Sequence, residues 1–293
     1  MTTASRDFRS KSAEKPRHQL STPDMAGINR TVAGKLREYA DLLVQQGEGG
    51  FRSRAFQKAG NAVEALPRGV DEILAAEGRA GLVALPTIGY GIAAAIAEML
   101  ATGRWSQLDR LQGEFAPETL FQTIPGIGPR LARRLAEDGH LENLADLEYA
   151  LHLNDLSIKG IGKRRKRMIA DALSERLGQP SQILIARKSV PSVTLLLDVD
   201  RTYRERAAAD KLRKIAPRRF NPNGEAWLPI MHMRRAGWHF TVHFSNSRLA
   251  HELRKTRDWV TVHFQRDGET EGRCTAITET SGPMMRKRVI RGR

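Results

Sequence analysis

The sequence predicts a mainly α-helical region followed by a small α+β domain. Apolar residues recur at three- and four-residue steps through 26–178, and this period is typical of helices with one buried face. From residue 191 onward the spacing is mostly alternating, as in half-buried strands. The change of period near residue 180 places a domain boundary there, and both parts of the 293-residue chain are long enough to form a core.

The first segment, residues 1–25, is predicted to be a disordered basic tail, because Ser, Thr, Lys, Arg and Pro dominate it and no apolar period is present. It has no apolar stretch of the kind that a secretory signal needs, and no run in the chain approaches the roughly 18 apolar residues of a membrane helix. The single cysteine, Cys274, excludes a disulfide framework and a zinc site built from several cysteines. We therefore expect a soluble protein of the cytoplasm.

Helices are expected in succession through two units, 26–115 and 116–180. The first helix places its apolar residues on one face, and the second begins near Phe51 and is closed by Pro67. The residues of that first face are Ile28, Val32, Leu36, Tyr39 and Leu43. Further helices are predicted to begin, between glycine and proline breaks, near Val70, Gly91, Trp105, Pro117, Pro129, Leu144 and Lys163.

The last unit, residues 181–293, is predicted to contain strands at 193–200, 239–244 and 259–264. Helices are expected between them at 201–214 and 247–255. His232, His239, His243 and His263 lie in predicted strands, and the alternation puts His239 and His243 on one face. A histidine metal site would require these side chains to converge, so we expect instead polar-face histidines near water or DNA. The segment 211–220 (KLRKIAPRRF) holds five cations and an aromatic residue, so it is interpreted as a phosphate contact, a platform for an unpaired base, or an ordinary surface loop.

Three segments of the helical region repeat one pattern at spacings of 39 and 34 residues: LPTIGYG at 85–91, IPGIGPR at 124–130 and IKGIGKR at 158–164. Each is a hydrophobic residue, a tight turn and a helix start, with Thr87 in the first where the others have glycine. Glycine lets another backbone approach closely, and the unpaired N–H groups at a helix start suit a phosphate oxygen. The pattern is that of the helix-hairpin-helix motif, which holds a DNA backbone without reading bases.

The charge of the chain agrees with this interpretation, because 48 Lys plus Arg against 33 Asp plus Glu give a formal charge of +15. Cations follow the second and third turns directly, and such contacts are independent of base sequence and weaken as salt rises. The residues predicted to contact DNA are Gly89, Gly91, Gly126, Gly128, Gly160 and Gly162 in the turns, with Arg130, Arg133, Lys163, Arg164 and Lys166 after them.

Several stretches occur in the order of a known family: INRTVA at 28–33, ADLL at 40–43, FR at 51–52, AFQKA at 55–59, LPTIG at 85–89, LATG at 100–103 and IPGIGP at 124–129. With them, residues 28–178 resemble the N-terminal part of the X-family DNA polymerases, the group that contains DNA polymerase beta. The resemblance implies a helical domain that binds the 5′-phosphate side of a DNA gap. It also implies a monovalent cation held by backbone carbonyls of the second hairpin, here at Ile124 and Gly126.

Some members of that family carry a deoxyribose-phosphate lyase, which forms a Schiff base through a lysine in the helix after the first hairpin. The two positions at which the family has lysines are Gly91 and Ala95 here. Neither can supply the primary amine that a Schiff base needs. Lys58 is the nearest basic residue carried over from the family pattern, and a phosphate or solvent contact is its simpler interpretation.

A polymerase is the other enzyme that the resemblance implies. Asp198 and Asp200 have the alternate spacing of a magnesium-binding carboxylate pair on a strand, although no Gly-Ser nucleotide-binding turn precedes them. The simpler interpretation is a solvated pair that caps a helix at Arg201. Phe240, Asn246 and the residues after them are a faint echo of the family's palm, so the last domain is either a reduced, inactive palm or unrelated.

We expect, on balance, a sequence-independent DNA-binding protein that holds gapped, nicked or branched DNA by its phosphates during repair. The alternatives are a divergent X-family polymerase or lyase, for which magnesium would be required if it is polymerase-like, and a scaffold whose basic surface meets acidic protein partners.

Overall fold

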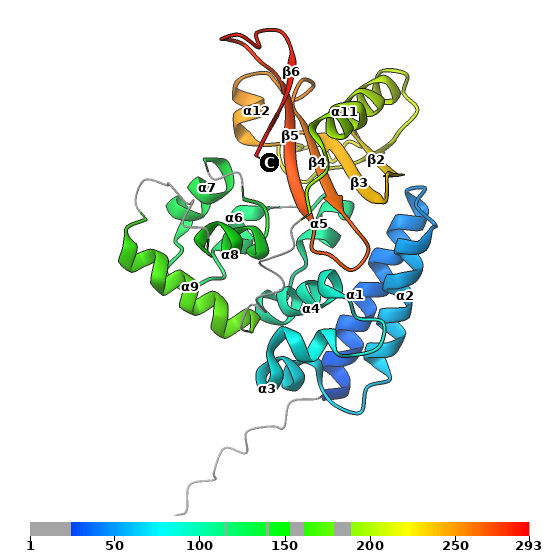
Figure 1. Ribbon diagram of the computed structural model, residues 1–293, viewed down its shortest axis with the longest axis vertical. Helices are drawn as coiled ribbons and strands as arrows, with labels where there is room; N and C mark the ends of the chain where they lie inside the picture. The colour runs from blue at the N-terminus through cyan, green and yellow to red at the C-terminus, as the bar shows by residue number, and fades with distance from the viewer. Residues whose placement is uncertain (1–24, 115, 139–140, 153–160, 179–188, 293) are drawn as a thin grey trace, which may run out of the picture.

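The computed structural model describes residues 25–114, 116–138, 141–152, 161–178 and 189–292. Helices fill the first part of the chain, as the apolar period predicts (Figure 1). Their bounds are α1 Met25–Gln45, α2 Phe51–Glu64, α3 Val70–Val83, α4 Tyr90–Thr102, α5 Ser106–Gln112, α6 Pro117–Phe121, α7 Pro129–Glu137, α8 Leu144–His152 and α9 Lys163–Leu177.

The helical region has one continuous core, which runs from α1 to α9. Its largest aromatic group joins α1, α2 and the start of α5: the ring of Tyr39 lies 4.7 Å from Phe56 and 4.4 Å from Trp105. Val32, Leu36, Tyr39 and Leu43 are buried at the face that the spacing predicts, because residues three and four apart point the same way on a helix.

The last part of the chain is α+β, so the predicted fold class is confirmed. One six-stranded sheet has the simple antiparallel order β1 to β6, and two helices accompany it. The bounds are α11 Val193–Ala208, β1 Arg213–Ile215, β2 Leu228–Arg235, β3 Trp238–Phe244, α12 Arg248–Glu252, β4 Val260–Gln265, β5 Gly272–Thr278 and β6 Arg288–Arg291.

One predicted strand is wrong, and the helix predicted at 201–214 ends at Ala208, before β1. The segment 193–200 was expected to be a strand, and the helix was expected to begin at Arg201; instead α11 begins at Val193, where the Ser192 side chain accepts the Leu195 N–H at 3.2 Å. Leu196, Val199 and Tyr203 lie on one helical face and pack on the sheet, so the three- and four-residue spacing and not the alternation describes this segment.

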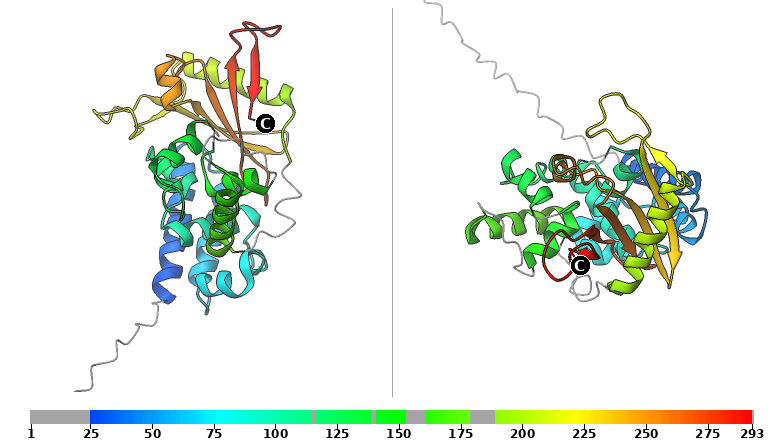
Figure 2. Two further views of the ribbon diagram at one scale, coloured as in Figure 1. Left: turned by 90° about the vertical axis from the view of Figure 1, so that its left-hand side faces the viewer. Right: turned by 90° about the horizontal axis from the view of Figure 1, so that it is seen from above.

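Both faces of the sheet are covered, and they differ in chemistry. On one face Phe240, Val242 and Val262 pack against α11. The other face is polar and lies against the helical region, and Figure 2 shows the sheet between α11 and the helices below it. Since strand side chains alternate between faces, the polar half of each alternating strand is the half that meets the helices.

The expectation that the four histidines face water or DNA is therefore wrong. The His232 imidazole lies 2.8 Å from the Gln46 side chain, and His239 lies 3.0 Å from Glu48, both in the connection from α1 to α2. His263 lies 3.4 Å from Glu142 and stacks on His243 with ring centroids 5.4 Å apart. Burial lowers the pKa values of His232, His243 and His263 to about 4, so these rings are neutral at pH 7.

Buried ion pairs cross the same contact. Arg110 of α5 pairs with Glu271, the residue before β5, at 3.0 Å, and Arg273 pairs with Glu142 at 2.9 Å. Although burial favours the protonated carboxyl, Arg110, His263 and Arg52 hold the pKa of Glu271 well below its ordinary range. These ion pairs favour one arrangement of the sheet on the helices, because any other arrangement would leave buried charges without partners.

Among the described residues, no helix combines the length and the apolar character that crossing a membrane requires.

Candidate nucleic-acid interface

The first hairpin is formed as the pattern predicts, but a protein loop covers it. Gly89 precedes α4 with φ −85° and ψ 175°, and the next N–H, that of Tyr90, donates to the Gly268 carbonyl at 3.1 Å. Gly268 lies in the β4–β5 loop, which reaches down from the sheet to α4 (Figure 1). The helix-start N–H that was expected to meet a phosphate oxygen therefore meets a backbone carbonyl oxygen.

The glycines of this hairpin are nevertheless needed for a close approach, as predicted. A Cβ at Gly89 would lie 3.1 Å from the Cα of Gly268, and one at Gly91 would lie 2.6 Å from the Glu269 carbonyl oxygen. The partner is the chain's own backbone, so this geometry does not support DNA contact at Gly89 and Gly91. Thr87 has φ 67°, the left-handed conformation that Gly126 adopts at the matching position of the second hairpin with φ 85°.

The second hairpin has the same backbone and an open surface. Gly128 precedes α7 with φ −83° and ψ 174°, and a Cβ placed there would meet nothing within 4 Å. Pro125, Gly126, Gly128, Arg130 and Arg133 are all exposed. Within the described part of the chain, the backbone N–H groups of Gly128 and Arg130 have no hydrogen-bond partner. Two donors and two guanidinium groups are thus presented together at a helix start.

The start of α9 is open in the same way. Gly162 has φ −81° and ψ 168°, a Cβ there would also meet nothing within 4 Å, and Lys163 and Arg164 are exposed. Lys166, one turn further on, is half-buried. Gly160, the first glycine of this hairpin, lies outside the described residues, so its DNA contact stays a prediction.

The second hairpin lies against α9, the helix that begins after the third turn. The end of the exposed Met168 side chain of α9 lies beside Gly126 and would meet a Cβ placed there, and the Arg176 side chain donates to the Thr123 carbonyl at 2.7 Å. Gly126 itself has φ 85°, which favours glycine. The two open helix starts therefore belong to one structural unit, formed by α6 to α9.

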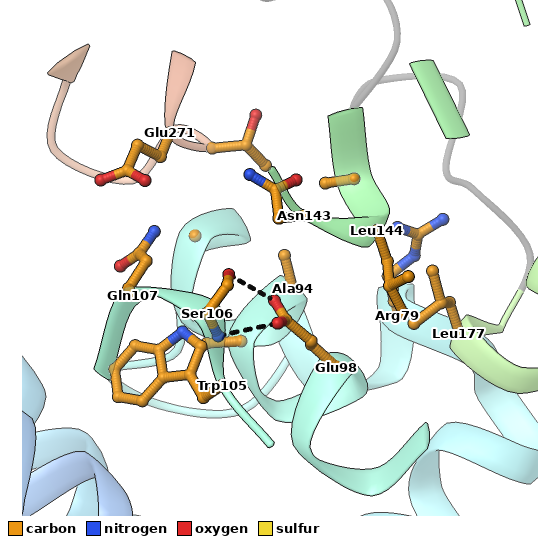
Figure 3. A pocket seen from close by; sticks show the side chains of 14 residues that line it. Arg79, Ala94, Glu98, Trp105, Ser106, Gln107, Asn143, Leu144, Leu177 and Glu271 are labelled. Carbon is orange, nitrogen blue, oxygen red and sulfur yellow. Dashed lines mark hydrogen bonds between the residues drawn. The ribbon is translucent and has the colours of Figure 1, made fainter. Parts of the chain in front are cut away.

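The two positions at which the resemblance places lyase lysines line a small cavity of about 40 Å³, which the buried carboxylate of Glu98 also lines (Figure 3). Ala95 and Gly91 lie at its wall, and the buried carboxylate of Glu98 accepts hydrogen bonds from Ser106, at 2.8 Å from the backbone N–H and 3.2 Å from the hydroxyl. Burial raises the pKa of Glu98 to about 7, although these hydrogen bonds act in the opposite direction. The cavity has room for about three waters and contains no primary amine, and Lys58 is exposed on α2.

The carboxylate pair does not form a magnesium site. Asp198 and Asp200 are two residues apart on the helix α11, so their side chains point in different directions. Asp198 pairs with Arg201 and Arg235, and the buried Asp200 accepts from Arg288 at 2.9 Å. Among the described residues, no group of three or more His, Cys, Asp or Glu side chains is arranged to hold a metal ion. Both aspartates therefore hold the last domain together.

The expected monovalent cation at the second hairpin stays a prediction. The Ile124 carbonyl accepts the Ile127 N–H at 3.1 Å, which closes the turn and still leaves one lone pair. Gly126 is exposed beside it.

We did not predict that the β4–β5 loop covers the first hairpin, although the sequence indicates the turn in that loop. Asp267-Gly268 lies between two alternating segments, and such a dipeptide indicates a tight hairpin turn. The signal finds the turn but not the helix start on which it packs. Arg110 and Glu271 are 161 residues apart, and no local pattern pairs them.

Comparison with known proteins supports the helical resemblance. Residues 28–105 match the helix-hairpin-helix domain family, a range that contains the first hairpin and ends before the second. The chain is also similar to DNA polymerase lambda of Arabidopsis thaliana, with 26% identity over 175 residues, which is 58% of this chain and 31% of that polymerase. The expectation of a helix-hairpin-helix region of X-family polymerase type is confirmed. The matched part of the chain corresponds to less than a third of the length of that polymerase.

Proposed function

We propose that this protein binds DNA independently of base sequence, through the phosphates that meet its second and third hairpins, and holds gapped, nicked or branched DNA during repair. A helix-hairpin-helix region and the similarity to a DNA polymerase support DNA binding in a repair context. The open helix starts at Gly128 and Gly162 support the finer statement about which surface binds.

The observation that carries the proposal is the pair of open helix starts at Gly128 and Gly162. Each combines N–H groups at the positive end of a helix dipole with exposed cations, Arg130 and Arg133 on α7 and Lys163 and Arg164 on α9. An acidic surface over either turn would argue against this function. Instead α9 begins with five consecutive cations, residues 163–167.

The polymerase and lyase alternatives receive no comparable support from the geometry. The aspartates expected to bind magnesium are paired with arginines, and the positions expected to hold the lyase lysines are Gly91 and Ala95. The proposed activity is therefore binding.

The sharpest test replaces both open glycines by aspartate, Gly128→Asp with Gly162→Asp. The backbone at both positions is that of a helix N-cap, where aspartate is favoured over glycine, so the melting temperature should be unchanged or raised. The carboxylates occupy the phosphate sites and repel DNA, so affinity for gapped, nicked and blunt duplexes should fall about 10- to 100-fold at low salt. Fluorescence anisotropy at two salt concentrations measures both the affinity and its salt slope.

The matched control is the isosteric pair Gly128→Asn with Gly162→Asn, which fills the same space without charge and should lose less affinity. Unchanged DNA affinity in the aspartate variant, with the fold intact, would show that these helix starts do not bind phosphate. Equal affinity of the natural protein for gapped and blunt DNA would remove the preference for repair intermediates.

A further inference from the structure

An exposed ring cluster lies outside the hairpins, on the connection between β1 and β2, which projects from the edge of the sheet (Figure 2, left). The Phe220 side chain is 44% exposed, and its ring centroid lies 4.4 Å from that of His251 on α12. The Trp227 ring meets His251 edge-on at 6.4 Å, and the Arg219 guanidinium lies 4.9 Å from the centre of the Phe220 ring. Three rings and a guanidinium thus form one group at the surface, which we call the ring cluster.

The ring cluster is held in place and not simply left in solvent. Phe220 has φ 54°, a conformation that side-chain-bearing residues rarely adopt, so the surrounding structure must fix it. The Asn246 side chain does so from both ends: it donates to the Arg219 carbonyl at 3.0 Å, and its oxygen lies 2.6 Å from His251 Nε2. Strain at an exposed aromatic residue, maintained by specific hydrogen bonds, is typical of a binding position.

The ring cluster is also tied to the second hairpin. Arg219 forms ion pairs with Glu118 of α6 at 2.7 Å and Glu137 of α7 at 3.5 Å, and Arg248 of α12 reaches Glu137 at 3.2 Å. Glu137 ends α7 and Gly128 precedes it, so about 14 Å of helix separates the open turn from the carboxylate that Arg219 and Arg248 contact. At about 3.4 Å per nucleotide, that length of helix corresponds to about four nucleotides along one strand.

The chemistry of the ring cluster fits a nucleobase. A planar ring beside a guanidinium offers stacking and cation–π contact, which every base accepts regardless of its identity. Arg218, two residues before Phe220, and Arg254, three residues after His251, are exposed and suit the phosphates on either side of such a base. The same charge disfavours a basic protein partner.

We propose that Phe220, with His251 and Trp227, stacks an unpaired base of the DNA strand whose phosphates the second and third hairpins hold. The inference rests on the proposed function for its placement on a duplex, and it names the ligand class as DNA in which a duplex adjoins single-stranded nucleotides.

The test compares three probes of matched sequence with the full chain: a blunt duplex, a duplex with a single-stranded tail, and the single strand alone. Phe220→Leu keeps apolar bulk but removes the π-face, so it should weaken binding of the tailed duplex and the single strand about tenfold and leave the blunt duplex unchanged. Phe220→Trp should restore binding. A 2-aminopurine base in the tail should change fluorescence with the natural protein and with Phe220→Trp, and not with Phe220→Leu.

Met284→Ala is the matched control, because Met284 is an equally exposed apolar residue, 45% exposed, on the distant β5–β6 loop. The proposal is overturned if Phe220→Leu binds the tailed duplex and single strand as tightly as the natural protein, or loses affinity for all three probes alike. Failure of the proposed function would give a different result, in which the Gly128→Asp, Gly162→Asp variant binds the blunt duplex as tightly as the natural protein does. The single-strand probe would still show stacking through its Phe220 dependence.

Discussion

The first and second hairpins have almost the same backbone and opposite surroundings. The glycine before each helix has φ and ψ within a few degrees of the other, −85° and 175° at Gly89 against −83° and 174° at Gly128. A Cβ would meet the protein's own β4–β5 loop at Gly89 and open solvent at Gly128. One local structure therefore serves as an internal docking site in one place and as an exposed surface in the other.

The hairpin pattern therefore determines the backbone conformation of the turn, and it does not determine which group binds there. A helix start with small residues accepts any oxygen-bearing backbone that approaches it, whether a DNA phosphate or a peptide carbonyl. At Tyr90 the acceptor is the Gly268 carbonyl. Three predictions test whether the covered hairpin is a fixed part of the fold.

The largest effect is expected for Arg110→Ala, which removes the guanidinium between Glu271 and Glu142 beneath the covering loop. Because a buried carboxylate loses its partner, the free energy of unfolding should fall by about 3–5 kcal/mol, as measured by urea denaturation. The control Arg68→Ala removes an exposed pair with Glu77 and should cost less than about 1 kcal/mol. A loss as small as that of the control would mean that the sheet is not held on the first hairpin by these charges.

Acid should weaken the same contact. His232, His243 and His263 have pKa values of about 4 in the fold against 6.5 ordinarily, so between these values only the unfolded chain binds the protons. The three histidines together should lower the free energy of unfolding by about 5 kcal/mol from pH 7 to pH 5, and the opposing contribution of Glu98 leaves a net fall of about 2–4 kcal/mol. Glu98 opposes this: since its folded pKa is raised to about 7, its contribution grows as pH falls.

Urea denaturation at the two pH values measures this fall, and two variants assign it. His263→Gln should reduce the difference between pH 7 and pH 5, and Glu98→Gln should increase it, because the opposing group is gone. Equal stability at both pH values in the natural protein would contradict the buried, neutral state of these histidines.

The smallest effect contrasts two alanine substitutions, one in each hairpin. Gly91→Ala places a Cβ 2.6 Å from the Glu269 carbonyl oxygen and should lower the free energy of unfolding by about 1–2 kcal/mol, despite alanine's better helix propensity. Gly128→Ala meets open space and should cost less than about 1 kcal/mol. Gly91→Ala should leave affinity for a blunt duplex unchanged. A reversed order of the two stabilities would show that the loop does not pack on the first hairpin.

Much of the fold could be predicted because a few neighbouring residues indicate where a helix begins and ends. The starts of α3, α6, α7, α8 and α9 fall at the residues expected from proline, glycine and apolar spacing. The failure at 193–200 has a local cause too: VTLLLDVD satisfies both the alternating and the helical period, and packing of Leu196 and Val199 on the sheet decided between them.

The candidate site was predictable as a set of turns and not as a surface. The glycines and cations of all three hairpins follow from pattern and charge, whereas the cover over Gly89 depends on a loop more than 170 residues away in the sequence. Likewise Asp198 and Asp200 have metal-like spacing only on a strand, and on α11 they pair with arginines.

What the sequence determined alone is the set of turns, the helices that begin after them and the strong positive charge, since each depends on a few neighbouring residues or on simple counting. Tertiary structure decided which helix start stays open, because only packing brings Gly268 to Tyr90 and leaves Gly128 uncovered. It also decided that the polar face of the sheet is buried. Whether a helix start is exposed depends on how the whole chain packs, so it cannot be predicted from a short segment.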